Sequence, residues 1–199
     1  MRLISVVVVG LSLLLCIGEP ARCADLVDRL SVPGPLNLNA ETYRLSWSSH
    51  PSRYYYKQEY LPAGQTGEHF QSMVLIEAIT QAADVPGVVS AQVNRLNQRK
   101  ASDPTVNFAV VKNSTTDEVI LDFILSVDGG KGETIVEWNA YRYAMLKGTN
   151  GNSGVLLLGL SRRAYGDATT QFLRAVKSAR PPTIDALAKY PLPAVRPRD

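Results

Sequence analysis

Two carboxylates and an amide are the side chains in this sequence that are best suited to chemistry. Asp122, Glu137 and Asn139 lie on two predicted strands, and the register that we predict places Asp122 opposite Asn139, with Glu137 on the adjacent diagonal. Carboxylates in such a group can bind a cation or act as a general acid and base. The alternative is a polar strip on a wet or partly covered sheet face. Because no His or Cys joins the group, we favour the polar strip.

Three arginines and three tyrosines near these strands are a second group of candidates. Arg142 interrupts an apolar strand face, and a buried guanidinium needs a carboxylate or a ligand anion as its partner. We favour an internal Asp or Glu, and the alternative is a pocket lined by Arg142, Arg162, Arg163, Tyr141, Tyr143 and Tyr165. The candidate ligand-binding residues are therefore Asp122, Glu137, Asn139, Arg142, Tyr141, Tyr143, Arg162 and Arg163.

The sequence lacks the motifs of common catalytic and cofactor sites. His50 and His69 are its only histidines, it has no G-x-S-x-G motif, and the order of residues alone does not support a Ser-His-Asp triad. A zinc site would need more His or Cys ligands. The glycine-rich residues 129–132 lack the P-loop spacing and lead into a predicted strand, whereas a phosphate loop leads into a helix. We therefore expect no catalytic residue, no metal and no cofactor.

The strands that carry the carboxylates form a predicted hairpin within residues 118–146. The odd positions of its first strand and the even positions of its second strand are apolar, apart from Arg142. If each strand buries one face, odd residues must pair with even residues. Pairing Phe123 with Trp138 meets this condition, makes these two side chains neighbours in the core, and places Gly130-Lys131 at a type II′ turn.

Two helices and several further strands are predicted around the hairpin. One helix begins after Asp84, with Pro86 in its first turn, and ends at residues 102–104. A second helix begins after Asp167 and is stopped by Pro181-Pro182. Strands are predicted for residues 43–47, 53–62, 107–112 and, with both faces covered, 154–165, while residues 73–80 fit either a buried strand or a helix.

This order of elements predicts an α+β fold with a single antiparallel β-sheet and helices packed on its faces. From Tyr43 to Ala179 the chain resembles the PsbP-like family, both in element order and in the stretches Glu59–Thr66 (EYLPAGQT) and Ser161–Gly166 (SRRAYG). Members of that family are extrinsic photosystem proteins, a nuclear import factor and exported bacterial proteins, mostly binding or assembly factors. The resemblance thus implies a PsbP-like sandwich and a binding role, and it assigns no functional residue.

The N-terminus is typical of a secretory signal peptide. Arg2 precedes the apolar run Leu3–Ile17, and Ala21-Arg22-Cys23 matches a cleavage site before Ala24. An uncleaved membrane anchor would need about 20 apolar residues. We expect an exported protein, periplasmic or secreted, with no stable membrane anchor after cleavage. Its predicted parts are a signal peptide (1–23), an N-terminal arm with little regular structure (24–40), one α+β domain (41–190) and a loosely held Pro-rich tail (191–199).

Charge and cysteine content restrict the partners of the mature chain. Removing Arg2, Arg22 and Glu19 lowers the formal net charge from +3 to +2, which is too small to indicate nucleic acid as a partner. Both cysteines lie in the predicted signal peptide, so a cleaved chain has no disulfide and no thiol chemistry.

Two functions fit these observations. The favoured one is a non-enzymatic binding or accessory protein that engages a partner protein or a small ligand. The alternative is a hydrolase-type enzyme that uses Asp122 and Glu137. A deep pocket that holds both carboxylates would favour the enzyme, whereas a flat tyrosine-rich or apolar patch would favour the binding protein.

Overall fold

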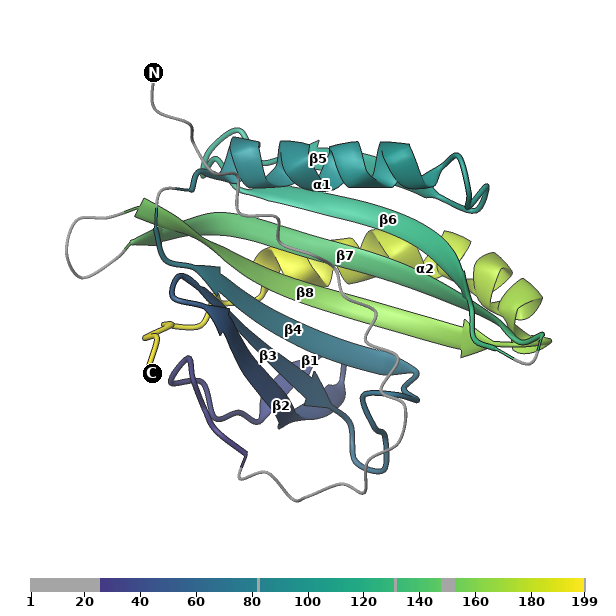
Figure 1. The fold of residues 1–199 in the computed structure, drawn as a ribbon, viewed down its shortest axis with the longest axis horizontal. Coiled ribbons are helices and arrows are strands. Elements are labelled where there is room, and N and C mark those ends of the chain that lie inside the picture. Colours follow the sequence, from purple (N-terminus) through teal and green to yellow (C-terminus); the bar gives the residue numbers. More distant parts are fainter. Residues whose placement is uncertain (1–25, 82, 131, 148–152, 199) are drawn as a thin grey trace.

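The computed structural model of the protein describes residues 26–81, 83–130, 132–147 and 153–198. It is a mixed α/β fold with two helices and one curled, antiparallel sheet of eight strands (Figure 1). The first half contains β1 (Leu36–Leu38), β2 (Glu41–Ser52), β3 (Tyr55–Leu61), β4 (Ser72–Ile79) and α1 (Val85–Arg99). The second half contains β5 (Asn107–Lys112), β6 (Val119–Asp128), β7 (Thr134–Lys147), β8 (Ser153–Tyr165) and α2 (Ala168–Lys189).

The sheet consists of two meanders that join at their last strands. Its order is β1-β2-β3-β4-β8-β7-β6-β5, so β4 and β8 lie at the centre and α1 is part of the connection between the two halves. Val74 of β4 is paired with Leu160 of β8. The predicted strand over residues 154–165 is confirmed, and residues 154–161 are buried, as expected for an interior strand with both faces covered.

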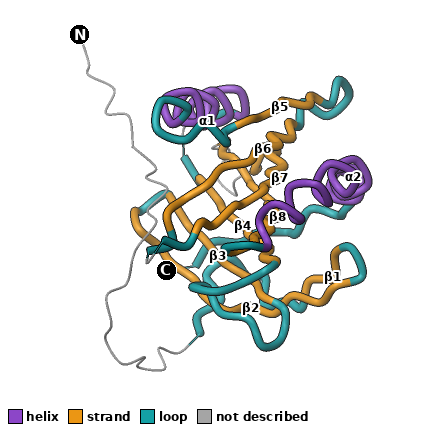
Figure 2. The backbone as a smooth tube through the Cα atoms, turned by 90° about the vertical axis from the view of Figure 1, so that its right-hand side faces the viewer, coloured by secondary structure: helices purple, strands orange, loops and turns teal. Residues whose placement is uncertain are grey.

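Each side of the sheet carries its own hydrophobic cluster, because successive side chains of a strand point to opposite faces. The two helices lie on different sides of strands β6 to β8 (Figure 2), and each contributes to a different cluster. The first cluster includes Val74, Ile76, Trp138, Leu158 and Leu160 of the sheet, Val176 and Leu187 of α2, and Leu30 and Leu36 of the N-terminal segment. The second includes Leu75, Leu121, Phe123, Tyr141 and Leu157 of the sheet and Val85, Val89 and Leu96 of α1.

The register of the β6–β7 hairpin differs by one residue from our prediction, which was wrong. Phe123 pairs with Asn139, and Trp138 pairs with Ile124, so the two aromatic side chains lie in different clusters on opposite faces. The alternation of apolar residues misled us because both faces of both strands are buried along most of the hairpin. In such strands a polar residue does not mark the solvent side.

The turn of this hairpin is also longer than the predicted type II′ turn. The paired strands end at Asp128 and Thr134. Between them, the N–H of Gly129 donates to the carbonyl of Glu133 at 2.8 Å, and the N–H of Glu133 donates to the carbonyl of Gly130 at 3.0 Å. Lys131, which we placed in the turn, lies outside the described residues.

The first predicted helix is confirmed, but the end of the second was predicted wrongly. Asp84 caps α1, since its Oδ1 accepts a hydrogen bond from the N–H of Gly87 at 2.6 Å. α2 continues through Pro181 and Pro182 to Lys189. Proline inside a helix costs about 3 kcal/mol because it removes a backbone hydrogen bond. Contacts between α2 and the sheet on both sides of the prolines, described below, offset this cost.

Both ends of the described chain are more ordered than the sequence indicates. The segment 24–40 contains β1, and the N–H of Leu30 donates to Oε1 of the buried Gln58 at 2.8 Å. The tail runs beside this segment: the N–H groups of Arg196 and Arg198 donate to the carbonyls of Leu30 and Arg29, both at 2.8 Å. The predicted signal peptide lies outside the described residues, and no helix within them is long and apolar enough to cross a membrane.

Candidate functional site

The predicted pair of carboxylates does not form a group. Asp122 pairs with Ala140 and not with Asn139. Its side chain lies on the face of the first cluster, whereas Glu137 and Asn139 point to the opposite face because their pairing partners, Leu125 and Phe123, belong to the second cluster. The one-residue difference in register thus separates the residues that we had placed together.

Asp122 is part of the contact between the sheet and α2. It is 3% exposed and accepts a hydrogen bond from Nε1 of Trp138 at 2.6 Å. Arg180 of α2 donates from Nε to its Oδ2 at 2.9 Å and also forms an ion pair with the same oxygen. Both carboxylate oxygens are therefore engaged, and this contact fixes α2 immediately before its two prolines.

Arg142 has an internal carboxylate partner, which confirms the favoured interpretation of this residue. It is 8% exposed, and its Nη2 lies 2.8 Å from Oε2 of Glu118. Its Nη1 donates to the carbonyls of Leu187 and Tyr190 at 3.0 and 2.7 Å. Carbonyl groups at the end of a helix have no N–H donor within the helix. Arg142 supplies donors to them and so caps the C-terminus of α2.

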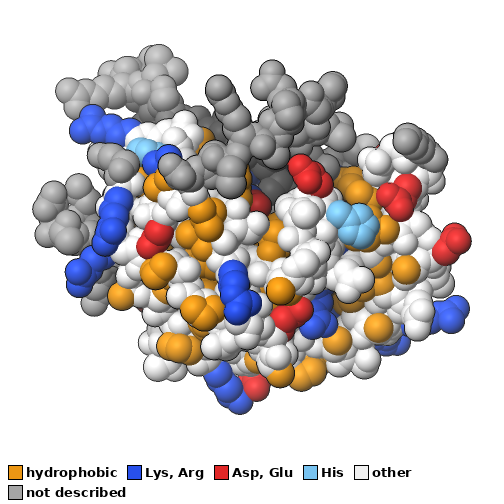
Figure 3. Space-filling view, turned by 90° about the horizontal axis from the view of Figure 1, so that it is seen from below, with side chains coloured by type: hydrophobic (Ala, Val, Ile, Leu, Met, Phe, Trp, Pro, Cys, Tyr) orange, Lys and Arg blue, Asp and Glu red, His pale blue; other side chains and the backbone are white. Residues whose placement is uncertain are grey.

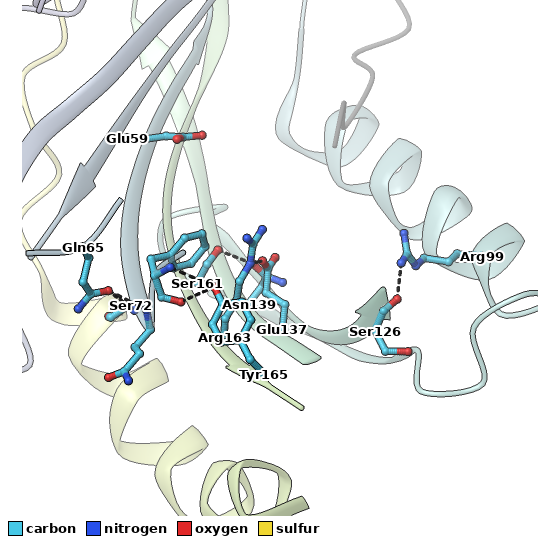
Figure 4. A network of polar contacts seen from close by, with 12 residues as sticks. Glu59, Gln65, Ser72, Arg99, Ser126, Glu137, Asn139, Ser161, Arg163 and Tyr165 are labelled. Carbon is cyan, nitrogen blue, oxygen red and sulfur yellow. Dashed lines mark hydrogen bonds and ion pairs between the residues drawn. The ribbon is translucent and has the colours of Figure 1, made fainter. Parts of the chain in front are cut away.

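Glu137 and Asn139, two further candidates from the hairpin, lie on the opposite face of the sheet, and Figure 4 shows them beside Arg163 and Ser161. Glu137 forms an ion pair with Arg163, whose guanidinium carbon lies 4.1 Å from the ring centroid of Phe70. Burial lowers the pKa of Arg163, but the charge and hydrogen bond of Glu137, together with Tyr165, outweigh burial and raise the pKa above its ordinary value. Asn139 is fully buried and accepts a hydrogen bond from Ser161, while its Nδ2 has no partner within the described part of the chain.

The two candidate tyrosines of β7 are core residues. Tyr141 and Tyr143 are 7% and 2% exposed and belong to the second cluster. Burial raises the pKa of both phenols above the ordinary value of 10.0, so they stay neutral. Neither is placed to act as an acid or a base near neutral pH.

A row of charges that the sequence analysis missed continues across β3 and β4 on this face. Nζ of Lys57 lies 2.9 Å from Oε1 of Glu59, and Glu77 accepts a hydrogen bond from the hydroxyl of Tyr55 at 2.8 Å. Burial raises the pKa of Glu77. Burial lowers the pKa of Lys57, but Glu77 and Glu59 outweigh this effect and raise it. Because these charges neutralise one another, we interpret the row as structural.

Arg162 differs from the other charged candidates, since none of the described residues is its partner. No hydrogen bond or ion pair holds its guanidinium within the described residues. It lines a hollow of about 470 Å³ at the end of β8, which we call the end hollow. Its lining residues are Glu41, His69, Gln71, Ser72, Arg162, Arg163, Ala164, Tyr165, Ala168 and Phe172.

A hydrogen-bonded group forms one wall of the end hollow. The hydroxyl of Tyr43 donates to Oε2 of Glu41 at 2.7 Å and lies 2.7 Å from Oγ of Ser72. Burial and the bond to Glu41 raise the pKa of Tyr43, whereas the positive charge of Arg162 acts in the opposite direction. Arg162 of β8 and Glu41 of β2 carry opposite charges, and both therefore lie near this hydroxyl.

The loop over residues 62–71 forms another wall and is fixed by side chains. Oε1 of Gln65 accepts hydrogen bonds from the N–H groups of Gln71 and Ser72, at 2.7 and 3.2 Å (Figure 4). The hydroxyl of Tyr165 accepts from the N–H of Phe70 at 3.0 Å and donates to its carbonyl at 2.9 Å. These contacts preform the end hollow.

The end hollow has the chemistry of a binding site for a charged ligand. Among the described residues, no group of three or more His, Cys, Asp or Glu side chains is placed to hold a metal ion. Of the residues predicted to line a pocket, Arg162, Arg163 and Tyr165 line the end hollow. Glu41 and Ser72 were missed because they lie far away in the sequence, and only the pairing of β4 with β8 brings Ser72 opposite Arg162.

A protein-family model matches residues 30–192 of the chain, and it belongs to a family without a characterised function. No curated protein and no solved structure matches the chain.

Proposed function

The chain belongs to that uncharacterised family, and we propose that it is an exported, non-enzymatic protein that binds a carboxylate or phosphate group of a small ligand in the end hollow. The observation that carries this proposal is the guanidinium of Arg162, which lines the end hollow without a hydrogen bond or ion pair to a described residue. An arginine always carries its charge and offers a planar set of donors that matches a carboxylate or a phosphate.

Three other arginines support this choice by contrast. Arg142, Arg163 and Arg180 each form an ion pair with a carboxylate inside the protein. Their charges are already neutralised, so only Arg162 among these four offers an uncompensated positive charge to a ligand. The volume of the end hollow, about 470 Å³, is typical of a small-molecule site.

The arrangement of carboxylates favours binding over hydrolysis. A general acid and base must face the same substrate, but Asp122 and Glu137 point to opposite faces of the sheet, and each is engaged by an arginine. The hydrolase-type function that uses these two residues therefore has no support from their geometry.

We further propose that the fold is a PsbP-like sandwich in which α1 and α2 cover opposite faces of the sheet. The two separate clusters, each with side chains from one helix, support this arrangement. Export remains a proposal that rests on the N-terminal sequence, and the intact mass of the protein recovered from the exported fraction tests cleavage at the Cys23–Ala24 bond. A full-length, membrane-bound product would contradict it.

Binding to Arg162 is tested with a matched pair of variants. We expect the purified protein to bind small carboxylates or phosphate in calorimetric titrations, and Arg162→Gln to weaken that binding at least tenfold. Arg174→Gln removes the same charge from an exposed position of α2 outside the end hollow and should bind as the parent does. Equal losses in both variants would reduce the effect to general electrostatics and would contradict the proposed site.

A further inference from the structure

We infer that the ligand of the end hollow is zwitterionic, of the α-amino acid type, with its carboxylate on Arg162 and its ammonium group on Glu41. This inference rests on the proposed function and makes it more specific. It follows from a second charge in the end hollow, which a purely anionic ligand would leave without a counter-charge.

Glu41 is the residue that supplies the second charge of the end hollow. Its Oε2 accepts the hydroxyl of Tyr43 at 2.7 Å, while Oε1 has no partner among the described residues. Glu41 and Arg162 line the same hollow without an ion pair within 4.0 Å, the range within which the described ion pairs of the protein fall. Two opposite charges that face one hollow without meeting match a ligand that carries both charges.

The hydrogen bond from Tyr43 holds the carboxylate of Glu41 in one orientation. Tyr43 is fully buried, and its hydroxyl is also in contact with the hydroxyl of Ser72. A carboxylate that is already oriented loses less conformational entropy when an ammonium group binds to it. Ser72 is 5% exposed and is paired with Arg162 across β4 and β8, so one framework positions both charges.

The remaining lining suits the body of such a ligand. Ala164, Ala168 and Phe172 form an apolar side with space for an aliphatic group.

The two charges also predict which ligands are excluded. A monocarboxylate leaves Glu41 without a counter-charge, and a dicarboxylate brings a second negative charge towards it. An amine without a carboxylate leaves Arg162 unpaired. A ligand that leaves a polar group of the site without a partner, or that brings like charges together, binds more weakly. The site therefore discriminates by penalising the wrong ligands.

The test compares three probes of one shape by calorimetry: L-leucine, 4-methylpentanoate, which lacks the amine, and 3-methylbutylamine, which lacks the carboxylate. We expect L-leucine to bind at least tenfold more tightly than either analogue. Glu41→Gln should remove the advantage of L-leucine over 4-methylpentanoate, because glutamine still accepts from Tyr43 but has no charge. Arg162→Gln should weaken both acids.

The two proposals fail in different ways. If 4-methylpentanoate binds as tightly as L-leucine and Glu41→Gln changes neither affinity, the zwitterionic ligand is wrong while the anion site at Arg162 stands. If none of these probes binds but phosphate does, the zwitterionic ligand is wrong and the anion site stands. If Arg162→Gln leaves all affinities unchanged, or if neither these probes nor phosphate binds, both proposals are overturned. Thermal unfolding of each variant serves as the control for folding, and Arg174→Gln as the control for charge.

Discussion

Asp103 shows how a single buried carboxylate can connect two elements. It is 5% exposed and follows the end of α1. Its two oxygens accept from the N–H and the hydroxyl of Ser126 on β6, each at 2.8 Å, and from Arg99 and Thr105, each at 3.0 Å. Burial alone would raise the pKa of Asp103, but these hydrogen bonds outweigh it and lower the pKa below 3.8.

Asp103→Asn is expected to lower the free energy of unfolding by about 1–3 kcal/mol at neutral pH, the usual cost of leaving buried donors unsatisfied. A carboxylate whose pKa is lowered by folding stabilises the protein above its unfolded pKa and loses this contribution as the pH falls through the folded pKa. Urea unfolding at several pH values should therefore show less acid sensitivity below pH 3.8 in this variant than in the parent. An unchanged profile would contradict this role, and Asp117→Asn in an exposed turn is the control.

Glu77 gives the opposite pH dependence. Burial raises its pKa in the folded state above the ordinary value of 4.5, so the folded protein holds a proton that the unfolded chain releases. The free energy of unfolding should then fall as the pH rises from about 4.5 to the folded pKa. In Glu77→Gln this decline should be absent, as measured by the same titration, and a decline of equal size in both proteins would refute the assignment to Glu77.

At the scale of elements, the β6–β7 hairpin shows where sequence reasoning succeeded and where it failed. The existence of both strands, of α1 and its cap at Asp84, and of the interior strand β8 followed from apolar spacing and turn residues. The register did not, because Asp122 and Asn139 are buried polar residues whose partners come from α2 and β8. The alternation of apolar and polar residues along a strand does not reveal partners from other elements. It therefore cannot show which face a residue points to when the strand is covered on both sides.

The corrected register predicts how two core truncations combine. Phe123 and Trp138 are each 1% exposed, so Phe123→Ala and Trp138→Ala should each cost about 3–5 kcal/mol. Since the two side chains belong to clusters on opposite faces, their costs should add to within about 0.5 kcal/mol in a double-mutant cycle. A coupling energy of about 1 kcal/mol or more would indicate that the two rings are in contact on one face, and would contradict the corrected register.

Arg142 makes the end of α2 dependent on the sheet. Arg142→Met would leave Glu118 without its ion pair and the carbonyls of Leu187 and Tyr190 without a donor, which should cost about 3–5 kcal/mol. Hydrogen exchange should become faster in the last turns of α2. Combining this change with Glu118→Gln should recover part of the loss, and a double variant no more stable than Arg142→Met would contradict the ion pair as its cause.

At the scale of the molecule, the charge distribution is mixed. Side chains of both charges are interspersed with hydrophobic ones on the face seen from below (Figure 3). This surface agrees with the small net charge of the sequence. The binding proposal therefore depends on one arginine, Arg162, in the end hollow. That arginine was among the candidates from the sequence, but its freedom from internal partners followed only from the fold.

The contact between the two ends should contribute measurably to stability. Truncating the chain after residue 193 deletes the hydrogen bonds from Arg196 and Arg198 to the segment that contains Leu30 and the packing of Val195 on the first cluster. A typical hydrogen bond contributes about 0.5–1.5 kcal/mol, so we expect a loss of about 1–3 kcal/mol in denaturant titrations. An unchanged midpoint would mean that this contact is weak in solution.

The pairing of β4 with β8 has a consequence for how the chain is made. β4 is complete before α1 is synthesised, but its partner β8 follows only after β5, β6 and β7. Until then the backbone groups on one edge of β4 have no strand to pair with, and the apolar residues Val74 and Ile76 lack their partners on β8. A ribosome that stops before β8 would therefore release an aggregation-prone half-sheet, and a chain threaded through a membrane channel would reach its native topology only after its last third had emerged.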